Sequence, residues 1–118
     1  MRTLAVMFVL VAVLCAGGAW AQERPAGSPE RGKTLYLVLG CSACHGTHGQ
    51  GGDRGAGPKI YPDPFPWGAF LFQTRKPRLD MPAYIVPWVS DQDVADMYAY
   101  LLSLKRAPAT KDIPLLNP

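Results

Sequence analysis

CSACH, at residues 41–45, places a histidine directly after the second of two cysteines that are three positions apart. Cys41 and Cys44 can each form a thioether with one vinyl group of a haem, and His45 can then bind the iron through an imidazole nitrogen. This spacing is the attachment signature of c-type haem. It predicts one haem c, held covalently by Cys41 and Cys44, with His45 as an iron ligand.

Zinc is the main alternative for this stretch. Cys41, Cys44, His45 and His48 could supply four nitrogen and sulfur ligands. All four fall within eight residues, which is much tighter than the paired ligand spacing of zinc fingers and disfavours zinc. A redox-active C-x-x-C would need a βαβ setting, and a Cys41–Cys44 disulfide would close too small a loop to stabilise much.

The first 21 residues have the pattern of an export signal. Arg2 is a short basic start, residues 4–16 carry no charge, and AWA at 19–21 is an A-x-A cleavage motif. The apolar run of 13 residues is shorter than the ~20 residues that a membrane-spanning helix needs. We therefore expect a signal peptide at 1–21, a mature domain at 22–118, and a periplasmic location.

Cys15 raises the separate question of a lipid anchor, because it lies near the end of the apolar run. Leu14 before it is bulky where a bacterial lipoprotein signal usually carries glycine or alanine, which disfavours lipidation. We expect no stable membrane insertion after the signal is removed.

Composition supports a cofactor within the core. All 12 prolines and 10 of the 12 glycines fall after residue 21. A small chain with so much irregular backbone buries a thin core by itself, and a large flat apolar group would complete it. The formal charge is only +3 over the whole chain, and no basic stripe with interleaved aromatics predicts nucleic-acid binding.

The N-terminal helix is expected to begin after Ser28, where an N-cap hydroxyl precedes Pro29, and to end at Gly40 in the left-handed conformation. Its predicted inner face comprises Gly32, Leu35, Tyr36 and Leu39. Glycine inside a helix costs ~1 kcal/mol relative to alanine. Gly32 therefore predicts the close approach of another helix.

The C-terminal helix is expected over Ser90–Lys105, with Ser90 and Asp93 as a capping box, basic residues Lys105 and Arg106 at its negative end, and Pro108 as its stop. Its predicted apolar stripe comprises Val94, Met97, Tyr98, Leu101 and Leu102. A short helix is also expected from Trp67 to Lys76. No alternating run is long enough for a sheet, so the predicted fold class is all-α.

A sixth iron ligand can be argued from the residues after the signal, which contain two methionines and one histidine besides His45. Met97 falls on the apolar stripe and is expected to pack in the core, and His48 is too close to His45 to reach the opposite face of the ring. Met81 lies in an irregular segment 36 residues beyond His45. Met81 is therefore the expected sixth ligand, with an open or water-bound iron as the alternative.

Several weaker motifs occur in a familiar order. They are Gly32 and Tyr36, the CSACH sequence, the turn with Gly57, Pro58 and Ile60, the pair Met81-Pro82, and the pair Tyr100-Leu101. From about Ser28 to Lys105 the chain thus resembles a class I monohaem cytochrome c. The resemblance implies a small all-α fold with long irregular loops, in which the N- and C-terminal helices cross around the haem.

The same resemblance assigns further roles. Gly32 would contact Met97 and Tyr100, and the Pro58 carbonyl would accept the free ring N–H of His45, which fixes the imidazole. Ile60 departs from the leucine that the family usually has at this turn.

An iron bound by both His45 and Met81 has no open position for a substrate. The predicted function is therefore outer-sphere electron transfer, as a carrier or as the cytochrome subunit of an oxidoreductase, similar to cytochromes that serve periplasmic dehydrogenases. The expected partners are redox proteins, either a dehydrogenase or an oxidase. A ligand-binding or peroxidatic haem protein is the alternative if Met81 does not bind iron, and a zinc module is a lesser one.

One dense basic cluster, Arg75, Lys76 and Arg78, precedes the Met81 segment. It could steer an acidic partner surface toward the haem edge. It could equally pair with haem propionates or with Asp80. Both interpretations stay open at the level of sequence.

Overall fold

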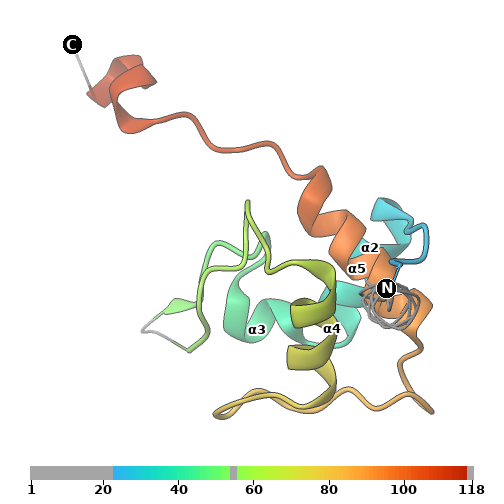
Figure 1. Cartoon of the computed structure of the whole chain (residues 1–118). Coiled ribbons are helices and arrows are strands. Elements are labelled where there is room, and N and C mark those ends of the chain that lie inside the picture. Colours follow the sequence, from blue (N-terminus) through green and yellow to red (C-terminus); the bar gives the residue numbers. More distant parts are fainter. Residues whose placement is uncertain (1–22, 54–55, 117–118) are drawn as a thin grey trace, which may run out of the picture.

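The computed structural model describes residues 23–53 and 56–116. Over this part the chain forms helices and loops and no strand, as Figure 1 shows. The helices are α2 (Pro29–Val38), α3 (Cys41–His45), α4 (Trp67–Arg75), α5 (Asp91–Ser103), η2 (Thr110–Asp112) and η3 (Pro114–Leu116). The predicted all-α fold is confirmed. The proposed signal peptide, with Cys15, lies outside the described residues.

Both terminal helices begin as predicted. The Ser28 side chain accepts a hydrogen bond from the Arg31 amide, and Ser90 and Asp93 form the full capping box at the start of α5. Gly40 has a φ of 81°, the left-handed conformation expected after α2. These three signals are local, because each depends on residues within one helical turn.

α2 crosses α5 so closely that the two backbones are in contact, because Gly32 at the crossing has no side chain. A Cβ at Gly32 would lie 1.9 Å from the Asp96 carbonyl oxygen and 2.9 Å from the Met97 nitrogen. The predicted close approach is therefore confirmed. Tyr100 packs next to the crossing, with its ring centroid 5.6 Å from that of Tyr36.

Asp96 ties the two helices together inside this crossing. Its carboxylate accepts hydrogen bonds from the Ser28 amide at 2.8 Å and the Gln92 side chain at 3.0 Å, and it pairs with Arg31. Burial disfavours the charged carboxylate, but these partners outweigh burial and lower the pKa of Asp96. The side chain is thus charged at neutral pH and links the start of α2 to the middle of α5.

Gly32→Ala is expected to destabilise the haem-bound protein by about 3 kcal/mol or more, because the added methyl meets backbone atoms that no side-chain rotation can move. Gly68→Ala is the matched control, since a Cβ at Gly68 in α4 meets nothing within 4 Å. Alanine there should be neutral or stabilise by up to ~1 kcal/mol. Denaturant unfolding of both variants measures the difference, and equal midpoints would contradict the described crossing.

The C-terminal helix ends at Ser103, earlier than expected. The predicted helix-end role of Lys105 and Arg106 is wrong, because α5 ends before both residues and its last turn holds no basic side chain. Arg106 instead pairs with Asp63 at 2.8 Å. The prediction that Leu102 belongs to the buried apolar stripe is also wrong, because the residue is 48% exposed. The chain after α5 runs away from the other helices and carries η2 and η3 (Figure 1).

Candidate functional site

α3 is a single short helix that carries Cys41, Cys44 and His45. Because its two cysteines are three positions apart, they project from the same side of the helix. Both thiols are free; Cys44 is exposed and Cys41 half-buried, and burial raises the pKa of the Cys41 thiol. The sequence does not predict α3, because five residues are too few to show a helical period.

Two tyrosines from the helix crossing hold the chain that follows His45. The Tyr36 hydroxyl donates to the Gly46 carbonyl at 2.8 Å, and the Tyr100 hydroxyl donates to the Thr47 carbonyl at 3.1 Å. The sequence identified both tyrosines as helix-packing residues but missed these hydrogen bonds. They connect the packing of α2 on α5 directly to the position of His45.

The His45 ring is buried and fixed by one hydrogen bond. Its Nδ1 lies 2.7 Å from the Pro58 carbonyl oxygen. A carbonyl can only accept, so Nδ1–H donates, and Nε2 keeps the free lone pair that a metal would bind. The structure therefore brings together the two residues that the resemblance paired.

Glycines allow the Pro58 segment to reach His45. A Cβ at Gly57 would lie 2.6 Å from the Cys44 carbonyl oxygen, and a Cβ at Gly52 would lie 2.0 Å from the same atom. The two glycines are also joined by a backbone hydrogen bond of 3.1 Å, from the Gly52 amide to the Gly57 carbonyl. Only residues without a side chain allow this loop to close over the end of α3.

Met81 lies in the irregular segment between α4 and α5 and is half-buried. The side-chain nitrogen of Gln73 on α4 lies 3.8 Å from the Met81 sulfur and donates a weak hydrogen bond to it. Met97, by contrast, is 3% exposed and packs in the core, as predicted. His48 is exposed, and its Nδ1 lies 3.0 Å from the Thr47 hydroxyl.

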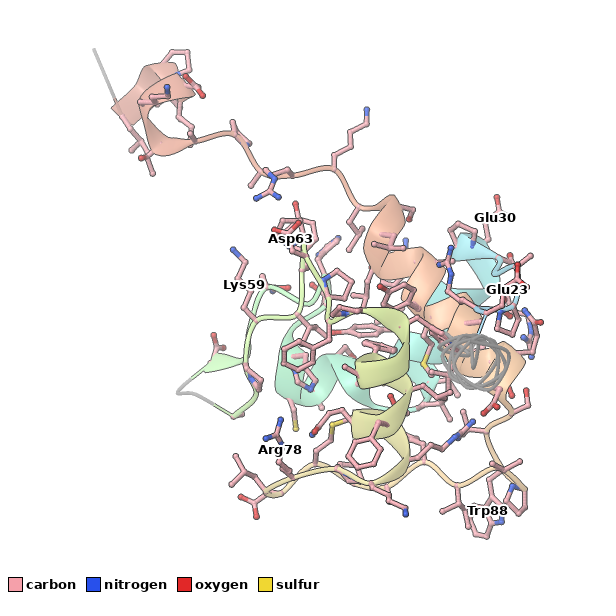
Figure 2. All side chains as sticks on the ribbon, viewed as in Figure 1. Glu23, Glu30, Lys59, Asp63, Arg78 and Trp88 are labelled. Atoms are coloured by element: carbon pink, nitrogen blue, oxygen red, sulfur yellow. The ribbon has the colours of Figure 1, made fainter. Side chains whose placement is uncertain are left out.

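An open hollow of about 230 Å³ adjoins the Met81 side of α4. It is lined by Phe65, Ala69, Phe72, Gln73 and Arg78. Both phenylalanines are more than half exposed, and Figure 2 shows Arg78 rising from the segment after α4 toward α3. Aromatic rings beside one guanidinium suit a flat apolar group that carries carboxylates.

Trp67, the first residue of α4, provides a further test of whether a flat apolar group with carboxylates fits here. The indole is buried against Tyr98, with ring centroids 5.7 Å apart, yet within the described residues its Nε1–H has no hydrogen-bond partner. A buried donor without an acceptor costs ~1–3 kcal/mol. A bound group with a carboxylate would satisfy it. The sequence does not mark Trp67 as special, because no sequence pattern distinguishes a buried indole that lacks an acceptor from one that is only packed.

The alternative zinc site is not assembled. In the part of the chain that the structure describes, no three histidine, cysteine or acidic side chains gather as metal ligands. Free thiols, an imidazole with one nitrogen available, an aromatic hollow and an indole donor without an acceptor among the described residues together fit a c-type haem.

The basic cluster does not form one surface. Only 15% of the Arg75 side chain is exposed, and it pairs with Asp91 at 2.5 Å. Of the two interpretations left open, Arg75 is therefore not a free charge for steering a partner, and its carboxylate partner is Asp91 and not Asp80. Lys76 is exposed, whereas Arg78 lines the hollow. Arg75 is paired with acceptors that lie 9 to 16 residues further along the chain. The sequence next to Arg75 therefore does not reveal that its charge is paired.

Among the helices that the structure describes, none is long and apolar enough to cross a membrane.

Comparison with known protein families gives a match. The family described as cytochrome c oxidase, cbb3-type, subunit III matches residues 27–101, which is well over half of the chain. No curated protein and no solved structure gives a significant match. The matched range contains α2 through most of α5, and with it the CSACH sequence, Pro58 and Met81. The chain therefore belongs to this cytochrome c family and is a c-type cytochrome with covalently bound haem.

Proposed function

We propose that the protein is a class I monohaem cytochrome that transfers single electrons, with His45 and Met81 as the axial ligands of one haem attached through Cys41 and Cys44. The observation that carries the proposal is the hydrogen bond from His45 Nδ1 to the Pro58 carbonyl, which leaves Nε2 for iron. When bound, the haem supplies a one-electron Fe(III)/Fe(II) couple.

The residues around the site favour electron transfer over substrate chemistry. His45 is oriented by Pro58, so its ring need not move between oxidation states. The Gln73 amide lies where it can hold the Met81 sulfur. If His45 and Met81 both held the iron, no open position would remain on it for a substrate. The Met81 thioether would also favour the reduced state of the iron relative to a second imidazole ligand.

The proposed cellular role rests on the sequence. We propose export to the periplasm, with cleavage near Ala21, and a redox enzyme as partner. The matching family is described as a subunit of an oxidase, which supports an oxidase as one such partner. A dehydrogenase fits the same chemistry, because either enzyme needs only a protein that gains or loses one electron.

Voltammetry of the purified haem-bound protein tests the proposal. We expect one reversible one-electron wave, and ferrous protein that does not bind carbon monoxide under native conditions, because Met81 holds the sixth position. Rapid stoichiometric binding of carbon monoxide by the unmutated protein would instead assign a ligand-binding or peroxidatic function.

A further inference from the structure

The segment that carries Met81 has little packing of its own. Residues 76–90 join α4 to α5 without regular secondary structure, and most of their side chains are exposed, including Leu79 at 98% and Trp88 at 84%. Leu79 also has a φ of 58°, a conformation that is unfavourable for a residue with a side chain. Such a segment keeps one shape only if contacts from outside it fix its course.

Arg75, the last residue of α4, supplies those contacts. Its Nη1 donates to the carbonyl oxygens of Tyr84 at 2.5 Å and Val89 at 2.7 Å. Its Nη2 pairs with the Asp91 carboxylate, in the first turn of α5, at 2.5 Å. One guanidinium therefore joins the start, the middle and the end of the segment through charge-assisted hydrogen bonds.

The middle point, Tyr84, is fixed from two other directions. Its backbone amide donates to the Thr74 carbonyl at 3.0 Å, and its hydroxyl donates to the Leu39 carbonyl at 2.9 Å, two residues before Cys41. Met81 thus lies between two anchored positions, Arg75 before it and Tyr84 after it. The chain between them is short, so the anchors restrict where the Met81 sulfur can go.

We infer that Arg75 is a positioning residue that keeps the Met81 sulfur on the haem iron by clamping residues 76–90 against α4 and α5. The inference rests on the proposed ligation by Met81 and adds the side chain that maintains it. Without the guanidinium, the carbonyls of Tyr84 and Val89 lose their donor, and the exposed segment gains freedom to carry Met81 away from the metal. An added small ligand would then take the sixth position more readily.

The test compares Arg75→Gln with Lys76→Gln in the haem-bound protein. Lys76 is the matched control, because it is the next residue and its side chain is exposed. Imidazole is titrated into the ferric proteins, and the near-infrared charge-transfer absorption of ferric thioether ligation is followed. We expect imidazole to bind Arg75→Gln at least about tenfold more tightly than the unmutated protein, because charge-assisted bonds are lost, and Lys76→Gln to match the unmutated protein.

Two further variants keep the test decisive if Arg75→Gln folds poorly. Asp91→Asn removes the ion pair and leaves both carbonyl contacts, and Arg75→Lys keeps the charge without the planar fork; each should give a smaller rise in imidazole affinity. On heating these variants, the thioether band should disappear at a lower temperature than the helical circular dichroism signal. That order separates loss of Met81 from the iron from general unfolding. Imidazole affinity unchanged in all three variants would overturn the inference. Absence of the thioether band from the unmutated protein would instead overturn ligation by Met81 itself.

Discussion

Replacing both Cys41 and Cys44 with alanine is expected to yield a chain that retains no haem through acid extraction and shows no cooperative thermal unfolding. Outside α2, α4 and α5, the buried hydrophobic core of the described residues includes only Val89. The remaining loops are rich in proline and glycine, and the hollow beside Phe65 and Phe72 is open. The haem must therefore provide much of the buried apolar area that a chain of this size needs.

Far-UV circular dichroism during heating measures this effect. The double variant should show a weak helical signal and a gradual change with temperature, whereas His48→Ala, which alters an exposed side chain near the same motif, should melt sharply. A sharp transition in the haem-free double variant would show that the helices alone supply the folding free energy.

Replacing Met81 with alanine is expected to convert an iron closed to carbon monoxide into one that binds it stoichiometrically. The reduction potential should also fall by roughly 0.1 V or more, within the span of about 0.8 V that axial ligands cover, because the thioether favours the ferrous state. Carbon monoxide titration of the ferrous protein and a redox titration provide the two measurements.

Met97→Leu is the control for that experiment. Met97 is buried in α5, and leucine has a similar volume, so the spectrum and the potential should stay nearly unchanged. If Met97→Leu opened the iron and Met81→Ala did not, the assignment of the sixth ligand would pass to Met97.

The features that the sequence predicted correctly are those set by neighbouring residues. The Ser28 cap, the Ser90–Asp93 capping box and the left-handed Gly40 each depend on a few consecutive positions. Gly32 was predictable for a different reason, because its cost within a helix requires a compensating contact. The fold class followed from these helices and from the absence of alternating runs.

The features that the sequence missed depend on partners far along the chain or on too few residues. Arg75 was assigned to a basic cluster with two possible roles, yet its acceptors are Tyr84, Val89 and Asp91, all of which follow Met81 in the chain. Trp67 stands out only in the structure, where its buried indole has no acceptor among the described residues. α3 was missed because one helical turn has no periodicity to detect.

The proposed attachment of haem at residues 41–45 and the proposed ligation by Met81 are tested most directly on the purified, unmutated protein. Its intact mass after acid and organic extraction tests the covalent attachment of haem. Its absorption spectrum in both oxidation states tests the ligation by Met81. We predict a mass higher by one haem and a ferric spectrum with the near-infrared thioether band. A colourless protein with stoichiometric zinc, made in cells with a working haem-attachment system, would contradict the account.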